Sequence, residues 1–186
     1  METTTTCVDS SIIRDSIVYA KKKLGISTLK PQQEKAFESM LRGHDVFMGL
    51  PTGYGKSVVF QGAAFCSEYI KRIQEKDDSN FVVVVMPLKA LIKDQLTRAG
   101  ELGIAAADIS SGLTDELREQ ISGQASGKTQ AFCGSYGQLG EIRSTLPSVP
   151  VIAMTATATT EARKQITHSL AMRNYATIVE SPDKPN

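Results

Sequence analysis

The feature that most constrains this chain is a phosphate-loop pattern, Leu50-Pro51-Thr52-Gly53-Tyr54-Gly55-Lys56-Ser57, placed directly after the apolar run 46–50. In such a loop, backbone N–H groups at a helix N-terminus bind phosphates, a Lys reaches the outer phosphates and a Ser hydroxyl binds Mg²⁺. Leu50 stands where the strict pattern has Gly, so the loop is a variant. The flanking apolar run and the helix-compatible run 58–61 favour a phosphate loop over an ordinary surface turn.

The composition predicts one globular domain. Hydrophobic residues make up 41% of the 186, charged residues 22%, and the net charge is +1, so any nucleic-acid contact must be local. Cys7, Cys66 and Cys133 are odd in number and far apart, which argues against a disulfide framework and a zinc site. The chain has neither a signal-peptide pattern nor an apolar stretch of the roughly 18 residues that a membrane span needs, so we expect an intracellular protein without a membrane partner.

Periodic apolar residues predict helices that alternate with strands. Expected helices cover 13–24, 31–42, 57–76, 88–96, a segment capped by Thr114, and 160–172. Expected strands cover 46–50, 81–86, 104–108, 150–155 and 175–179. The polar stretch 122–130 is expected to be a loop. This order predicts an α/β fold, a mostly parallel sheet with helices on both faces and nucleotide at the carboxyl ends of its strands.

Several segments in the same order resemble motifs of one helicase family. They are 29–33 (an adenine-recognition motif), the phosphate loop, 86–95 (motif Ia), Ser110-Ser111 (motif Ib), 139–143 with 154–159 (motif III), and 181–186 (a linker). Together they resemble the first RecA-like domain of the RecQ family of DNA helicases, in superfamily two. The resemblance implies an N-terminal tail and helix over 1–28, a shortened RecA-like ATP-binding domain over 29–181, and over 182–186 the start of a linker to an absent second domain.

The resemblance also implies ATP and Mg²⁺ as cofactors, single-stranded or forked DNA as partner, a monomer, and a nuclear role in DNA repair and recombination. It assigns the nucleotide to Lys30, Gln33, Thr52, Gly53, Tyr54, Gly55, Lys56 and Ser57, with Ser57 also on the metal. It assigns DNA to Pro87, Lys93, Gln95, Ser110 and Ser111, and coupling between nucleotide and DNA to Thr155 and Thr157. Without the surrounding motifs, a Gln or Lys on a helix is more often a solvated side chain than a binding residue, and a Thr at the end of a strand can be there only because Thr favours strands.

A segment that the family uses for hydrolysis is missing from this sequence. The family has a strand ending in Asp-Glu-Ala-His, whereas this chain passes from Gln130 directly to 131–136. Neither Asp115-Glu116 nor Asp108 replaces this acidic segment, because the first pair is typical of a helix start and Asp108 lacks a second carboxylate beside it. Gly127-Lys128-Thr129 is not a second phosphate loop, because no strand precedes it. We therefore assign no catalytic residue. Two hypotheses remain: a RecQ-family 3′-to-5′ helicase fragment that has lost hydrolysis and unwinding, or a silent binding module that regulates the full-length helicase. A phosphate-loop kinase is a distant third.

The missing strand should lie between the strands at 151–154 and 81–86. Without it, these strands must pair directly or leave backbone groups open, at about 1 to 3 kcal/mol for each buried group. We accordingly predict a less stable domain with a mobile junction at 122–135 and an exposed apolar patch around Val82, Val84 and Ile152.

Overall fold

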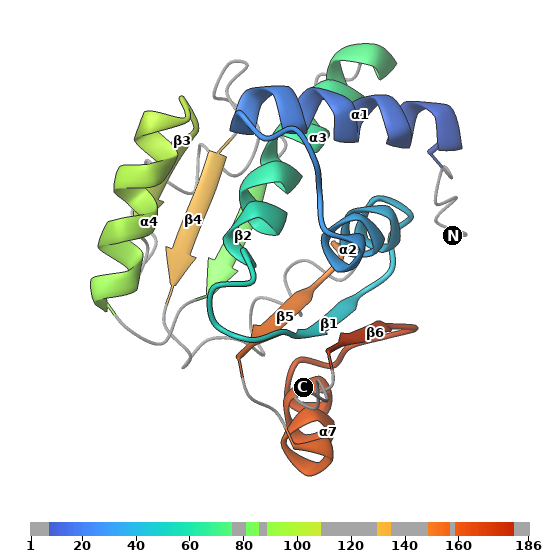
Figure 1. The fold of residues 1–186 in the computed structure, drawn as a ribbon, viewed down its shortest axis with the longest axis vertical. Helices are drawn as coiled ribbons and strands as arrows, with labels where there is room; N and C mark the ends of the chain where they lie inside the picture. The colour runs from blue at the N-terminus through green and yellow to red at the C-terminus, as the bar shows by residue number, and fades with distance from the viewer. Residues whose placement is uncertain are drawn as a thin grey trace, which may run out of the picture. The chain divides into compact units, whose positions relative to one another are not determined.

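The computed structural model describes residues 8–75, 81–85, 89–108, 130–134, 149–156 and 159–180. The chain divides into two compact units. The first unit holds residues 1–14, 29–59 and 139–186, and the second holds 15–28 and 60–138. Figure 1 labels the helices α1 (Ser10–Leu24), α2 (Pro31–Leu41), α3 (Ser57–Gln74), α4 (Lys89–Glu101) and α7 (Thr160–Ser169).

The first helix, α1, follows the expected apolar period. Ile13, Ile17, Ala20 and Leu24 are all buried. At its C-terminus Gly25 has a φ of +68°, and the N–H of residue 26 donates to the carbonyl of residue 21, which completes a Schellman motif. Local sequence signals alone therefore predicted where this helix ends.

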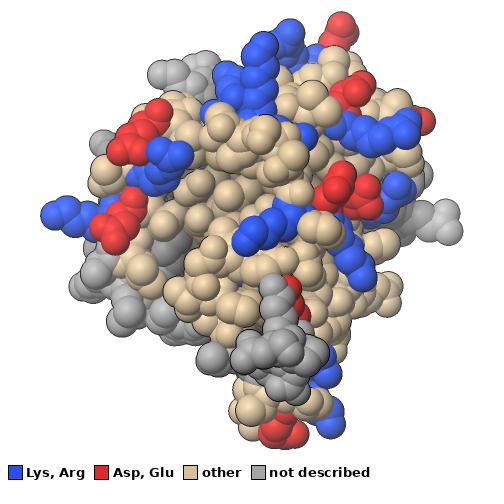
Figure 2. Space-filling view, in the orientation of Figure 1, with Lys and Arg blue, Asp and Glu red and all other residues tan. Residues whose placement is uncertain are grey.

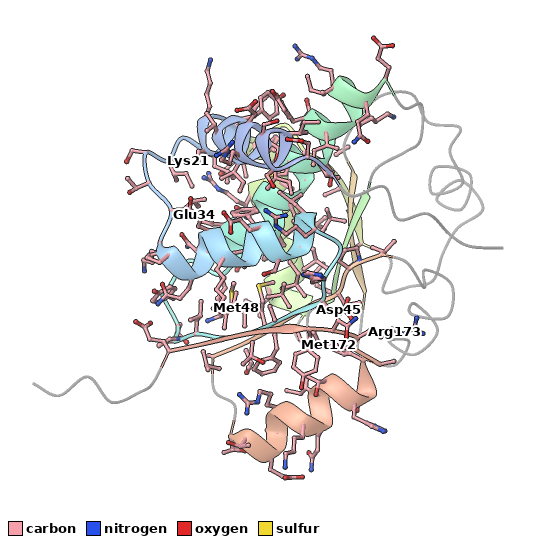
Figure 3. All side chains as sticks on the ribbon, turned by 90° about the vertical axis from the view of Figure 1, so that its right-hand side faces the viewer. Lys21, Glu34, Asp45, Met48, Met172 and Arg173 are labelled. Carbon is pink, nitrogen blue, oxygen red and sulfur yellow. The ribbon has the colours of Figure 1, made fainter. Side chains whose placement is uncertain are left out.

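The first unit contains a parallel sheet in the order β5-β1-β6, formed by β5 (Ile152–Thr155), β1 (Val46–Gly49) and β6 (Ala176–Val179). Helices α2 and α7 lie on opposite faces of this sheet (Figures 1 and 3). The core of the unit is formed by Ala36, Val46, Met48, Leu50, Val59 and Ile178. The expected parallel sheet with helices on both faces is confirmed here.

The second unit contains another parallel sheet in the order β2-β4-β3, formed by β2 (Phe81–Val85), β4 (Gln130–Gly134) and β3 (Ala105–Asp108). Strand β4 lies within the stretch 122–135, for which the sequence predicted a mobile junction. That expectation was wrong, because 130–134 pairs on both sides and completes the sheet. The rest of that junction and the helix expected after Thr114 lie outside the described residues.

The strands expected to flank the missing segment are not paired with each other in the described part of the chain. Among the described residues, β5 pairs with β1 alone and β2 pairs with β4 alone, in separate sheets. The predicted apolar patch was wrong for Val84, which is buried against Ile92 and Leu96 of α4, while Val82 and Ile152 are partly buried. Helix α4 thus covers Val84 of the second sheet.

Asp45 joins three segments of the first unit at the start of β1 (Figure 3). Its side chain is 2% exposed, and its two carboxylate oxygens accept the backbone N–H groups of Val151 at 2.8 Å and Arg173 at 2.6 Å. Reaching Asp45 requires the chain to turn before Arg173, and Ala171 adopts a φ of +46° there. The helix expected over 160–172 accordingly ends at Ser169.

Candidate nucleotide-binding site

The phosphate loop connects the end of β1 to the first turn of α3 (Figure 1). Gly53 and Gly55 have φ values of +81° and +80°, a backbone region that favours glycine. A Cβ atom on Gly55 would come within 2.9 Å of the Gln33 side-chain nitrogen. The two glycines that the sequence singled out are therefore required by the conformation of the loop.

Lys56 lies inside the curve of the loop. Its Nζ donates to the carbonyl oxygens of Leu50 at 2.8 Å and Pro51 at 2.9 Å. Partial burial lowers the pKa of this ammonium from its ordinary value. An anion at the N-terminus of α3 would compete with these carbonyls for the ammonium, and a charged acceptor makes the stronger hydrogen bond.

Gln33 is buried and its amide connects α2 to the loop. Its Oε1 accepts the backbone N–H of Lys30 at 2.9 Å, and its Nε2 donates to the carbonyls of Tyr54 at 3.2 Å and Gly55 at 3.0 Å. Both N–H donors are therefore used within the loop. Reading an adenine with this nitrogen would require exchanging one of the two bonds, so the adenine role of Gln33 stays a prediction.

Tyr54 projects from the loop toward the start of α2. The Nζ of Lys30 lies 3.9 Å from the centroid of the Tyr54 ring, a cation–π contact. Desolvation raises the pKa of the Tyr54 hydroxyl, the charge of Glu180 raises it further, and a hydrogen bond from Gln32 opposes both. Lys30, predicted to bind the nucleotide, thus contacts the loop itself in this structure.

The donor set at the loop fits a nucleotide phosphate with Mg²⁺. Ser57, whose hydroxyl is suited to a hard cation, is the first residue of α3, and Lys56 precedes it. The positive end of the α3 dipole adds to the attraction for anions. Thr52 is exposed at the turn of the loop. Within the described ranges, no group of three or more His, Cys, Asp or Glu side chains could hold a metal ion.

The residues predicted to contact DNA are described only in part. Lys93 is exposed on α4, whereas Gln95 is half-buried and accepts a hydrogen bond from Gln61 of α3 at 3.0 Å. Thr155 ends β5, and its carbonyl accepts the N–H of Leu50. The remaining predicted positions, Pro87, Ser110, Ser111 and Thr157, lie outside the described residues.

The visible surface carries charges of both signs. Figure 2 shows Lys and Arg interspersed with Asp and Glu, in keeping with the net charge of +1. No helix in the described part of the chain is long and apolar enough to span a bilayer.

Sequence reasoning missed two residues that flank the loop in the sequence. Gly49 ends β1, and a Cβ atom there would lie 2.9 Å from a methyl of Val179 in β6, so only glycine fits without a shift. Gln61 is a buried amide in an otherwise apolar part of α3. The signal that could have found Gln61 is this single polar residue between Phe60 and the apolar run 63–66.

Known proteins similar to this chain are helicases. The DEAD/DEAH box helicase family matches residues 30–143. The ATP-dependent DNA helicase RecQ of Haemophilus influenzae is 26% identical over 89% of this chain and 32% of its own length. The ATP-dependent DNA helicase Q-like 4B of Arabidopsis thaliana is 25% identical over 91% of this chain and 18% of its own length. The RecQ-like DNA helicase blm-1 of Caenorhabditis elegans is 27% identical over 87% of this chain and 20% of its own length.

These alignments also show that the relatives have residues inserted within the region that this chain matches. The alignments run over 206 to 217 residues, more than the 186 of this chain, so each relative carries residues with no counterpart here. The chain spans about a fifth to a third of the length of these relatives.

A solved structure supports the fold. The DUF1998 helicase MrfA, crystallised with DNA and AMPPNP, matches with a TM-score of 0.60 at 15% identity, over 92% of this chain and 30% of that one. At this identity the match shows the fold alone. The resemblance to RecQ helicases indicated by the motifs is confirmed by the relatives, and the RecA-like fold by this structure. Because the family match covers more than half of the residues, the chain belongs to the DEAD/DEAH box helicase family, with RecQ helicases among its relatives.

Proposed function

We propose that this chain binds adenine nucleotide with Mg²⁺ at the phosphate loop and binds single-stranded DNA weakly. The observation that carries the proposal is the loop itself, in which Lys56 and two glycines of positive φ stand between β1 and α3. Gln33, Lys30 and Ser57 would complete the nucleotide site. The DNA part is supported by the similarity to DNA helicases and by Lys93, exposed on α4.

We further propose that ATP hydrolysis and unwinding are lost in this chain by itself. The sequence has no Asp-Glu-Ala-His segment, and the longer alignments indicate residues that the relatives have and this chain lacks. A missing general base costs about 10² to 10⁴ in rate. These same observations favour the second candidate, a silent module that regulates a full-length helicase. From the similarity to RecQ helicases we propose that its role lies in DNA repair and recombination in the nucleus.

Titration of fluorescent ATP with Mg²⁺ against the wild type and Lys56→Ala tests the nucleotide site. We expect weaker binding in Lys56→Ala and unchanged binding in a matched control, Lys35→Ala, which removes an exposed lysine of α2. Equal affinity of the wild type and Lys56→Ala would remove the loop from the proposal. DNA-stimulated ATP turnover that Lys56→Ala abolishes would instead show that hydrolysis is retained.

A further inference from the structure

Gln61 and Gln95 form a hydrogen-bonded amide pair between α3 and α4, within the second unit. The Nε2 of Gln61 donates to the Oε1 of Gln95 at 3.0 Å. Gln61 is 8% exposed and Gln95 is half-buried. A buried amide without its partner is costly, so this bond favours one alignment of α4 against α3.

The two helices that carry the pair also make apolar contacts within the second unit. Phe60, which precedes Gln61, and Leu96, which follows Gln95, pack against the buried side chains Val84 and Ile92. Apolar contacts of this kind tolerate small shifts of one helix along another, because they have no direction. A hydrogen bond has a direction, and a single polar pair in an apolar contact can fix the register of two helices.

Lys93 lies on the same helix as Gln95 but faces solvent. It is exposed, and its backbone carbonyl accepts the hydroxyl of Thr97 at 3.1 Å within α4. Residues two apart on a helix point in different directions, so Gln95 can face α3 while Lys93 faces outward. The two predicted DNA residues of α4 therefore have different surroundings.

We propose that Gln61 and Gln95 are positioning residues for DNA binding, which hold α4 in the register that presents Lys93 to a DNA phosphate. The inference rests on the proposed DNA binding by α4. It reassigns Gln95, predicted from the sequence to contact DNA, to a role within the protein. It also gives Gln61, a residue of the helix that begins at Ser57, a part in DNA binding.

The experiment compares Gln61→Met, Gln95→Met and the double variant, since Met has a similar shape without the amide. Gln74→Met, on the same helix, is the matched control. Each single variant should lower the urea midpoint of unfolding, and the double variant should recover part of the loss because no orphan amide remains. Additive shifts in the double variant would overturn the pairing.

The second readout is the affinity for fluorescein-labelled oligothymidylate across a range of salt concentrations. Both single variants should weaken binding at least about twofold, as expected for residues of one hydrogen-bonded network. The slope of log affinity against log salt should fall by about 0.7, the value for one fewer neutralised phosphate on a single strand. Lys93→Ala should lower the slope equally, and adding it to Gln61→Met should have little further effect.

The outcomes separate this inference from the proposed function. If Gln95→Met weakens DNA binding and Gln61→Met does not, Gln95 contacts DNA itself and the inference fails. If the single variants unfold earlier yet keep the wild-type affinity and salt slope, the pair is only structural and the inference also fails. If Lys93→Ala binds DNA as tightly as the wild type, Lys93 does not contact a phosphate and the inference fails, while the proposed DNA binding stands. If the wild type binds no DNA, the DNA half of the proposed function fails and the inference with it, while nucleotide binding is judged by Lys56→Ala.

Discussion

Removing the Asp45 carboxylate should strongly destabilise the first unit. Its two oxygens accept N–H groups from Val151, just before β5, and Arg173, just before β6, so one side chain braces both neighbours of β1. A hydrogen bond to a charged group contributes about 1.5 to 3 kcal/mol. Asp45→Ala should therefore cost about 3 to 6 kcal/mol, against a typical domain stability of roughly 5 to 15 kcal/mol.

Urea unfolding followed by circular dichroism measures this cost. Asp45→Asn keeps one oxygen that can accept a backbone N–H, but its NH₂ group would face the other backbone N–H. It should therefore lower the free energy of unfolding about half as much as Asp45→Ala does. Asp94→Ala, which removes an exposed carboxylate of α4, is the control and should leave the midpoint nearly unchanged. If Asp45→Ala unfolds at the same urea concentration as this control, the carboxylate does not brace the sheet and the reasoning is wrong.

Three further predictions concern other positions. Gly55→Ala should weaken nucleotide binding about tenfold, because left-handed backbone costs a side chain roughly 1 to 2 kcal/mol and its Cβ would meet Gln33; in the same titration Gly100→Ala, in open space on α4, should have no effect. Burial raises the pKa of the Cys66 thiol from 9.0 to about 12, so the folded chain holds this proton more tightly than the unfolded chain. The resulting contribution to the stability of the fold is complete below pH 9 and is lost as the pH rises toward 12. With the other two cysteines changed to Ser, Ellman's reagent should label Cys66 at pH 8 no faster than the chain opens, and rapid labelling would contradict its burial. Tyr19→Phe should lower the free energy of unfolding by about 1 kcal/mol through loss of the 2.8 Å bond to Glu68, whereas Tyr175→Phe at an exposed site should not.

The local elements could be predicted because their signals are short-range. The apolar period of α1 and its stop at Gly25 lie within one stretch of sequence, as do Pro31 at the start of α2 and the β-branched run of β2. The phosphate loop was also predictable, because its glycines, lysine and serine must stand at fixed spacings to bind a phosphate.

Only the tertiary structure decided which elements pair with one another. Strand β4 was missed because its residues become a strand only when β2 and β3 pair with them on either side. The end of α7 was misplaced because Asp45, 128 residues before Arg173, draws that backbone away from the helix. The bond between Gln61 and Gln95 likewise joins side chains 34 positions apart. Sequence alone thus determined where the glycine-rich loop lies, since its pattern depends on neighbouring residues, while pairing depends on distant segments that meet only in the folded chain.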